Sequence, residues 1–313
     1  MHFLLVGPGA LGCLLSSIVT HGLVVTGDKL SLLDHNRQRA DYLTEHGIVY
    51  QQGDACKNVS VTVTSNPYSL DHVDVVLLCV KSYDVAATLR FCQPLLISTT
   101  LVVFLQNGIS HLSMPELLQD ASAAFGTTTE GATLLGRGHV IHTGRGTTSL
   151  GFLHSPNDRE AFLLKKIHTV FAAGGLQMRA TESILIAIWA KLFINVGINA
   201  LTAILACKNG ELLSLPGIDE RMRNAIDEAV RIAKAEGIQI LDDPYLATRT
   251  VCSKTAENVS SMLQDIRSKR RTEIDAINGA IVAKGLRYGI QTPENEVLCR
   301  QVQEIEASYR TAP

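Results

Sequence analysis

Short apolar runs recur along the N-terminal half of the chain, each ending at a turn signal. These runs have the length and composition of strands that are buried on both faces of a sheet. They lie at Phe3–Val6, Leu30–Leu33, Val75–Val80 and Leu101–Leu105.

Stretches with helical spacing follow the apolar runs. The first extends from a glycine-rich turn to about His21 and stops at Gly22, and two others lie at Arg37–Glu45 and Val85–Leu96. Strands that alternate with helices favour a parallel, doubly wound sheet of the Rossmann type.

The pattern changes between Gly126 and Phe152, where the chain becomes rich in threonine and glycine. We expect antiparallel additions at the sheet edge there, and a half-buried strand where Val59, Val61 and Val63 alternate with polar residues. A helix near Arg159–Ala173 closes a first domain, which we place at residues 1–178.

Strand signals fade after Thr181. Helical spacing dominates Arg221–Glu236, which stops at Gly237, and Ser260–Lys284, which stops at Gly285. The sequence therefore predicts an α/β protein: an N-terminal Rossmann-like doubly wound parallel sheet, then an all-helical C-terminal domain at residues 179–313.

Ile184–Ala206 is long and apolar enough to imitate a membrane span. Lys191, Asn195, Asn199 and Thr202 nevertheless recur along it at helical period and mark one polar face. Because such a stripe would be costly in lipid, we interpret the segment as a buried helix with a polar stripe facing a cleft.

Composition adds little beyond a globular, soluble class. The net charge of −2 gives no reason to expect a nucleic-acid or membrane partner. The seven cysteines form no C-x-x-C pair, so we expect free thiols in a reducing compartment and no metal site. The N-terminus shows no signal-peptide pattern.

The strongest local motif is Gly7-x-Gly9-x-x-Gly12, which follows a strand and opens a helix. Gly7 permits the tight turn, Gly9 lets the backbone approach a pyrophosphate, and Gly12 allows close packing of helix and strand. The unpaired N–H groups at the helix N-terminus would face the phosphates, so this motif indicates dinucleotide binding.

Asp34, Lys81 and Asn107 also follow strand ends, where ligands of such sheets bind. Taken alone, Lys81 equally suits a solvated lysine, and Asn107 suits a turn residue slightly better. Asp34 would favour the free ribose hydroxyl of NAD, whereas His35 to Arg37 would suit the 2′-phosphate of NADP, so the sequence points both ways.

Lys191, Asn195 and Asn199 would suit a small polyoxygenated anion, with the lysine as proton donor to a developing alkoxide. From the residues alone, a polar seam between packed helices fits them better. Asn258 and Ser261 likewise suit helix caps, and Glu273 suits a solvated charge.

The chain closely resembles the ketopantoate reductase (2-dehydropantoate 2-reductase) family over essentially its whole length. The resemblance rests on seven motifs: GPGALG at Gly7–Gly12, Val80-Lys81, Gln106-Asn107-Gly108, GTTT from Gly126, WAKLFINVGIN at Trp189–Asn199, NGEL from Asn209, and SSMLQDIRSKRRTEID at Ser260–Asp275.

The resemblance implies the reduction of 2-dehydropantoate to pantoate by NADPH, a step in pantothenate and coenzyme A biosynthesis. It implies Lys191 and Glu273 as catalytic residues, with Lys191 protonating the C2 oxygen. The implied substrate ligands are Lys191, Asn195, Asn199, Asn209, Asn258 and Ser261. The implied or expected cofactor contacts are Gly7, Pro8, Gly9, Ala10, Leu11, Gly12, Arg37, Lys81, Asn107, Ala132 and Glu273.

One departure concerns the cofactor. Family members often carry a basic residue directly after the second strand, where this chain has Asp34-His35. NADPH stays the expectation, and Asp34 leaves NADH open. We expect a cytoplasmic enzyme with a small-molecule substrate; a homodimer is open. Two alternatives are a related NAD(P)-dependent reductase of another 2-oxo acid and a non-catalytic NADP(H) sensor.

Overall fold

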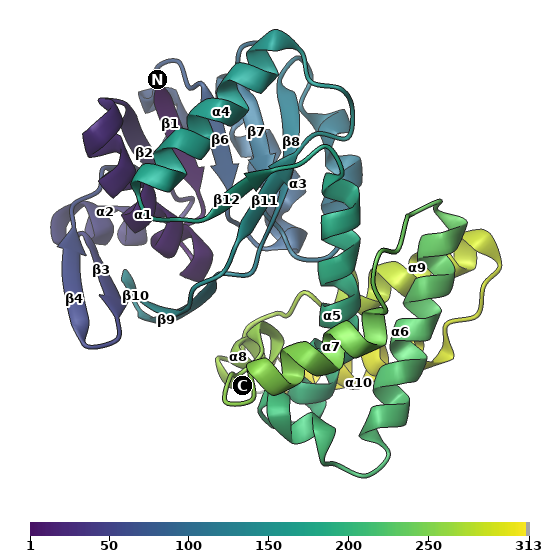
Figure 1. Ribbon diagram of the computed structural model, residues 1–313. Helices are drawn as coiled ribbons and strands as arrows, with labels where there is room; N and C mark the ends of the chain where they lie inside the picture. The colour runs from purple at the N-terminus through teal and green to yellow at the C-terminus, as the bar shows by residue number, and fades with distance from the viewer. Residues whose placement is uncertain (311–313) are drawn as a thin grey trace. The chain divides into compact units, whose positions relative to one another are not determined.

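The computed structural model describes residues 1–310, which divide into two compact units (Figure 1). Unit 1 contains residues 1–106 and 111–184, and unit 2 contains residues 107–110 and the described residues from 185 to 310. The short segment Asn107–Ser110 therefore belongs to unit 2 although unit 1 flanks it in sequence.

Unit 1 is built on a large sheet of eight hydrogen-bonded strands. In order they are β12 (Met178–Ala180), β11 (Thr148–Gly151), β8 (Ser122–Thr128), β7 (Leu101–Phe104), β6 (Val75–Leu78), β1 (His2–Val6), β2 (Lys29–Leu33) and β5 (Val63–Thr64). All neighbours are parallel except β11 and β8, which are antiparallel. The chain reverses direction of travel across the sheet at β1, the place where doubly wound folds bind nucleotides.

Helices cover this sheet because its strands are apolar on both faces. They are α1 (Ala10–Thr26), α2 (Arg37–His46), α3 (Val85–Phe91) and α4 (Asp158–Ala173). Helix α4, drawn in teal, crosses the near face of the large sheet and packs against α1 (Figure 1). Phe3, Leu77 and Val103 of the sheet form one core cluster with Leu14 and Phe171 of these helices.

A smaller sheet completes unit 1. It contains β4 (Ala55–Val59), β3 (Ile48–Gln52), β10 (His139–Gly144) and β9 (Gly131–Gly136) in that order. The predicted antiparallel edge addition is β11, whereas β9 and β10 join this second sheet. The predicted single strand through Val61 is wrong, because Val59 ends β4 and Val63 begins β5 in the other sheet.

The predicted end of the first helix at Gly22 is also wrong. Helix α1 continues to Thr26 and ends at Gly27, whose φ of +70° caps it. A Cβ on Gly22 would lie 2.1 Å from the carbonyl oxygen of Val170 in α4. Gly22 is therefore a site of close helix–helix approach rather than a helix terminator.

Unit 2 is all-helical among its described residues. Its helices are α5 (Ile184–Leu205), α6 (Ile218–Ala235), α7 (Pro244–Lys254), α8 (Ser261–Arg267), α9 (Asn278–Tyr288) and α10 (Pro293–Arg310). Short 3₁₀ turns lie at Asn209–Leu213 and Ile274–Ala276. The predicted fold class, a doubly wound parallel sheet followed by a helical domain, is confirmed.

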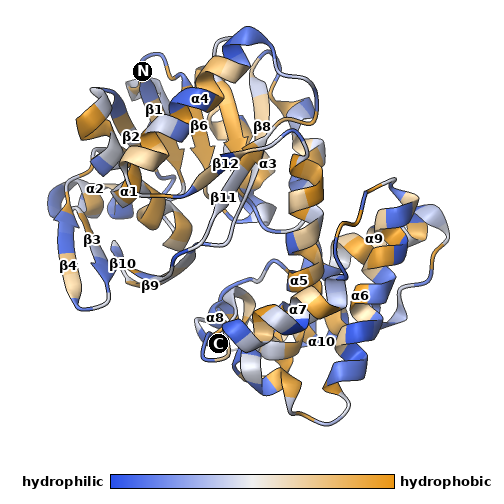
Figure 2. Ribbon diagram, viewed as in Figure 1, coloured by the Kyte–Doolittle hydropathy of each residue, from blue (hydrophilic) through white to orange (hydrophobic). Residues whose placement is uncertain are grey.

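Helix α5 is the one helix in residues 1–310 that is long and apolar enough to cross a membrane by composition. Figure 2 shows its predominantly hydrophobic colouring, which it shares with the strands of the large sheet. Of its most apolar stretch, 61% is buried within the structure. This agrees with a buried core helix.

Candidate functional site

The glycine turn after β1 has the geometry that its sequence predicts. Gly7 has a φ of +90°, and a Cβ there would lie 2.5 Å from Cγ1 of Val80. A Cβ on Gly12 would lie 2.1 Å from the carbonyl oxygen of Gly7, so helix α1 can approach the turn only without a side chain there. Both positions therefore require glycine for backbone reasons.

Gly9 differs from its two neighbours because a Cβ there would meet nothing within 4 Å. It is the N-cap of α1, no side chain caps the first N–H groups, and the first turn has no acidic residue. An open space in front of unpaired N–H groups and a helix dipole suits a pyrophosphate. The turn therefore fits a dinucleotide cofactor, and Pro8, Ala10 and Leu11 lie within it.

Asp34, at the end of β2, is 1% exposed and engaged on both oxygens. Nε and Nη2 of Arg39 donate to its carboxylate, and the backbone N–H of Asn36 donates to Oδ1 at 3.0 Å. Arg39, in the first turn of α2, retains about one third of its side-chain exposure. The pair thus presents a guanidinium whose charge is balanced by a buried carboxylate.

Arg39 was not predicted from the sequence as a residue of this site. Arg37, which the sequence predicts as a contact to the cofactor phosphate, is exposed. Its Nε lies 3.8 Å from Oδ2 of Asp41 on the same helix. The sequence carried one signal, because asparagine is a preferred N-cap residue. In the structure Asn36 caps α2 and accepts from the N–H of Arg39. This places Arg39 in the first helical turn, from which it reaches back to the strand end.

Lys81 and Ala132, both predicted cofactor contacts, also lie in unit 1. Lys81 follows β6 closely and opens a 3₁₀ turn at Ser82–Asp84. Ala132 lies in β9 opposite His142 and packs on the core cluster of unit 1. Lys81 therefore follows the strand that neighbours β1, as doubly wound sheets arrange their ligand contacts.

Three predicted site residues meet in unit 2. Nζ of Lys191 in α5 donates to Oδ1 of Asn107 at 2.8 Å, and Nδ2 of Asn107 donates to Oε2 of Glu273 at 3.0 Å. The amide thus connects the ammonium to the carboxylate, and Glu273 is only 5% exposed. The family resemblance implied all three as site residues, with Asn107 as a cofactor contact, and the link that Asn107 makes between the other two was not predicted.

The ammonium of Lys191 is electrostatically poised. Burial lowers its pKa to about 8, and the nearby carboxylate of Glu273 opposes that shift. A lysine with such a pKa is protonated at neutral pH yet releases its proton more readily than a solvated lysine. The arrangement therefore suits proton donation.

The polar stripe of α5 continues from Lys191 to Asn195 and Asn199. Nδ2 of Asn195 is buried and has no hydrogen-bond acceptor among residues 1–310. Asn199 is 5% exposed, on the same face. Because buried amide donors are costly when unpaired, the unpaired Asn195 Nδ2 indicates a group that accepts from it when the site is filled.

The remaining predicted substrate ligands come from two loops that pair with each other. The N–H of Asn209 donates to the carbonyl of Asn258 at 3.1 Å, and Nδ2 of Asn209 donates to Oγ1 of Thr255 at 2.9 Å. Oδ1 of Asn209 is buried with no donor among the described residues. Asn209 and Asn258 are therefore brought together by backbone pairing.

Ser261 begins α8 and is exposed. The preceding residue, Ser260, caps α8 through the N–H of Leu263, and its Oγ lies 2.7 Å from Oγ1 of Thr202 in α5. This contact ties the start of α8 to the polar stripe of α5. The helix cap is Ser260 rather than Ser261, which leaves the Ser261 hydroxyl outside the capping role.

The predicted helical stretch Ser260–Lys284 is not continuous. Helix α8 ends at Arg267, Lys269 has a φ of +52°, and α9 begins at Asn278 and runs through Gly285 to Tyr288. Ser261 and Glu273 therefore do not share a helical face. A turn, not a helix, presents Glu273 to Asn107.

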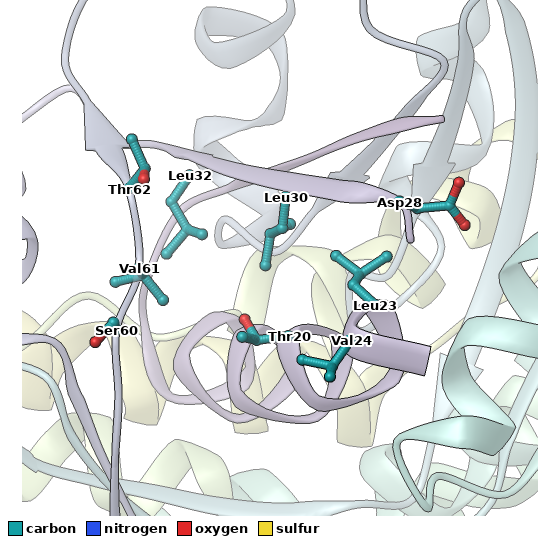
Figure 3. A pocket seen from close by; sticks show the side chains of 9 residues that line it. All are labelled: Thr20, Leu23, Val24, Asp28, Leu30, Leu32, Ser60, Val61 and Thr62. Atoms are coloured by element: carbon teal, nitrogen blue, oxygen red, sulfur yellow. The ribbon is translucent and has the colours of Figure 1, made fainter. Parts of the chain in front are cut away.

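A pocket of about 260 Å³ lies elsewhere in unit 1, between the end of α1 and the edge of the large sheet. Its lining includes Leu23, Leu30, Leu32 and Val61, and Figure 3 shows these apolar side chains around a common space. None of the predicted site residues lines it. The pocket is therefore separate from the candidate site.

Two family models match the chain. "Ketopantoate reductase PanE/ApbA" matches residues 3–155, and "Ketopantoate reductase PanE/ApbA C terminal" matches residues 183–306. The 2-dehydropantoate 2-reductase of Halobacterium salinarum is 32% identical over 94% of this chain and 95% of its own length.

Solved structures agree with these matches. A PanE/ApbA family ketopantoate reductase from Ralstonia eutropha has a TM-score of 0.88 and 30% identity, covering 99% of this chain and 100% of that one. D-mandelate dehydrogenase, solved with NADH and anilino(oxo)acetate, has a TM-score of 0.88 and 27% identity over 100% of both chains. The resemblance inferred from the motifs is confirmed, and the chain belongs to the ketopantoate reductase family.

Proposed function

We propose that this protein reduces 2-dehydropantoate to pantoate with NADPH, and that Lys191 is the proton donor. The observation that carries the proposal is the Lys191 ammonium on the polar face of α5, which Asn107 links by hydrogen bonds to the carboxylate of Glu273. Ketopantoate reductases are oxidoreductases that use NADPH, so the family supplies the reaction class.

Unit 1 would hold the cofactor through Gly7–Gly12, with Lys81 and Ala132 as further contacts. When bound, NADPH supplies the hydride that reduces the substrate ketone. The N–H groups at the start of α1 would bind its pyrophosphate, because a Cβ built on Gly9 meets no protein atom within 4 Å.

Unit 2 would bind the substrate and deliver the proton. Negative charge grows on the ketone oxygen as it is reduced, and Lys191 protonates that oxygen. Five polar residues would orient the carboxylate and hydroxyl groups of the substrate: Asn195, Asn199, Asn209, Asn258 and Ser261. Glu273 keeps Lys191 protonated and oriented through Asn107, and it contacts the cofactor.

The choice of cofactor depends on Asp34. An unpaired carboxylate there would repel a 2′-phosphate, but Arg39 and the N–H of Asn36 already occupy both oxygens. We infer that Arg39 converts this strand end into one that accepts the 2′-phosphate of NADPH. Arg37 stays a proposed second contact.

The direct test is NADPH oxidation, followed by absorbance, with 2-dehydropantoate as the substrate. Turnover that depends on 2-dehydropantoate and is lost in Lys191→Ala supports the proposal. NADPH binding without turnover on any 2-oxo acid would instead support a cofactor sensor.

A second candidate is the reduction of a different 2-oxo acid, favoured by the full-length similarity to D-mandelate dehydrogenase. A substrate panel that includes phenylglyoxylate, assayed with NADPH and NADH, separates the two. A higher kcat/KM for phenylglyoxylate would favour the alternative.

The cellular setting follows from the same proposal. We place the enzyme in the cytoplasm, acting on a small molecule, with no nucleic-acid or membrane partner. Fractionation of cells tests the location, and analytical ultracentrifugation tests whether the protein forms a homodimer.

A further inference from the structure

The buried carboxylate of Glu306, in α10, accepts hydrogen bonds from the residue that precedes Glu273. Oε1 of Glu306 accepts hydrogen bonds from the N–H of Thr272 at 2.7 Å and from the Thr272 hydroxyl at 2.6 Å. The same Thr272 oxygen accepts from the N–H of Ile274 at 3.2 Å. Thr272 is thereby bound directly to the Glu306 carboxylate, and Ile274, on the other side of Glu273, is bound to it through the Thr272 hydroxyl.

The other end of this turn is held by the loop that carries Asn107. The carbonyl oxygen of Ala276 accepts from the N–H of Ile109 at 3.2 Å, and the N–H of Ala276 bonds back to the carbonyl of Glu273 at 3.0 Å. Gly108 lies so close that a Cβ there would be 2.0 Å from the Ala276 oxygen. The turn 272–276 is therefore held from two sides.

All members of this arrangement are buried. Glu306 is 6% exposed, Thr272 is 1% exposed and Ile274 is 1% exposed. A carboxylate taken out of water is retained only where donors satisfy it, and these donors lie immediately beside Glu273. The geometry therefore couples Glu306 to the backbone position from which the Glu273 side chain reaches Asn107.

We propose that Glu306 is a positioning residue for the reaction: it fixes the turn that aims Glu273 at Asn107 and, through Asn107, at Lys191. This role rests on the proposed function, in which Lys191 is the proton donor. It adds a residue from α10 that lies outside every motif that pointed to the site.

The consequence is measurable at Lys191. The carboxylate of Glu273 opposes the effect of burial on the pKa of Lys191, which stands at about 8. If the turn loosens and Glu273 moves away, burial acts alone and that pKa falls further. Loss of stability by itself would not change the pKa in the folded protein.

Four variants separate positioning from general destabilisation. Glu306→Met removes the acceptor at similar side-chain length, and Glu306→Gln keeps an acceptor oxygen as the conservative rescue. Thr272→Val removes only the hydroxyl. The matched control is Glu228→Met, because Glu228 is 3% exposed and accepts from the N–H groups of Glu294 and Asn295 at the other end of α10.

The readout is the titration midpoint of Lys191 in the ligand-free protein. It is followed by NMR of ¹³C-labelled lysine, with Lys191→Met assigning the signal. We expect Glu306→Met to lower the midpoint by about one pH unit, the low end of what a nearby opposite charge contributes. Glu306→Gln should restore most of the shift, and Glu228→Met should leave the midpoint in place.

The alkaline limb of kcat provides the second readout. One pH unit corresponds to about a tenfold loss of protonated lysine on that limb. Equal midpoints in Glu306→Met and Glu228→Met would overturn the proposal. If Glu306→Met does not fold, Thr272→Val decides: a lowered midpoint supports the role, and an unchanged midpoint rejects it.

Failure of the proposed function is distinguishable from failure of this inference. A wild-type protein that turns over no 2-oxo acid contradicts the function, whereas the NMR midpoint reports on Glu306 without turnover.

Discussion

Lys191 and Asn107, which lie 84 positions apart in sequence, are joined by a 2.8 Å hydrogen bond from Nζ to Oδ1. The bond holds the ammonium on one side of an amide whose other side donates to Glu273. Asn107 was expected as a turn residue or a cofactor contact. It therefore has a further role, because it also holds the ammonium of Lys191, the proposed proton donor.

The pH dependence of reduction should follow Lys191. A general acid acts in its protonated form, and the pKa of Lys191 is lowered to about 8. We therefore expect kcat for reduction to be level below pH 8 and to fall about tenfold per pH unit above it. The reverse oxidation, which needs the free amine, should rise over the same range.

Lys191→Ala should lower kcat by roughly 10²- to 10⁴-fold and remove that alkaline limb. Steady-state rates measured from about pH 6 to about pH 10 test the lower kcat and the loss of the alkaline limb. This range extends about two units on either side of the pKa of Lys191. A variant with near-normal kcat would exclude Lys191 as the acid.

Gly9→Ala should leave folding intact but weaken cofactor binding. Its new Cβ meets no protein atom within 4 Å, so only a bound pyrophosphate would contact it. We expect a loss of about 1–3 kcal/mol in NADPH binding, the usual cost of overpacking, with little change in Tm. Calorimetric titration measures the affinity.

Gly136→Ala is the control for this change, since its Cβ also meets nothing within 4 Å and it lies outside the glycine turn. Equal NADPH affinities in the two variants would mean that the phosphates bind elsewhere.

Gly108→Ala should disturb the link between Asn107 and Glu273. At a φ of +79° its Cβ would lie 2.0 Å from the carbonyl of Ala276, a backbone atom that cannot move cheaply. Misplacement of the loop by about 1 Å can cost up to roughly 10²-fold in kcat.

Gly237→Ala is the matched control, because it has a φ of +72° and open space around it. Both variants carry the strain of a left-handed alanine, about 1–2 kcal/mol. If their kcat values agree, the loop has no special role in aligning the site.

Arg39→Ala should reduce the preference for NADPH. It removes the guanidinium and leaves the buried Asp34 carboxylate without its main partner, so the 2′-phosphate meets repulsion. A hydrogen bond to a charged group contributes about 1.5–3 kcal/mol, which corresponds to roughly 10- to 10²-fold in kcat/KM for NADPH.

NADH should be much less affected by Arg39→Ala. Arg37→Ala is the comparison, because an exposed arginine with a surface ion pair contributes about 0–1 kcal/mol. If Arg37→Ala has the larger effect on NADPH, the phosphate contact belongs to Arg37.

Asn199→Ala should mainly weaken substrate binding. Asn199 is 5% exposed on the polar face of α5, beside the unpaired amide of Asn195. We expect KM for 2-dehydropantoate to rise by roughly 10- to 10²-fold, the equivalent of one hydrogen bond to a charged group. Unchanged KM and kcat would remove Asn199 from the substrate site.

The sequence predicted the large sheet and the glycine turn after β1 because both depend on local patterns. Buried parallel strands need continuous apolar runs, and the turn after β1 needs glycine at Gly7 and Gly12 to admit neighbouring backbone. The local pattern gave a wrong prediction where a glycine allows two helices to pack closely and does not end a helix. Gly22 reads as a helix end but admits α4.

The site was only partly readable. Periodicity put Lys191, Asn195 and Asn199 on one face of a helix, yet the same spacing suited a packed polar seam. The link from Asn107 to Glu273 spans 166 positions and depends on a turn that interrupts the predicted helix after Arg267. No local pattern encodes a contact of that range.

By itself, then, the sequence determined the alternation of strands and helices in the first domain, the glycine turn and the polar face of α5, and the family resemblance supplied the proposed roles of the site residues. The tertiary structure decided that Asp34 is neutralised by Arg39, that Asn107 bridges Lys191 and Glu273, and that Glu306 holds the turn beside Glu273. The physical reason is that periodicity reports which face of an element is apolar, whereas the partner of a buried charge is chosen by packing between distant segments.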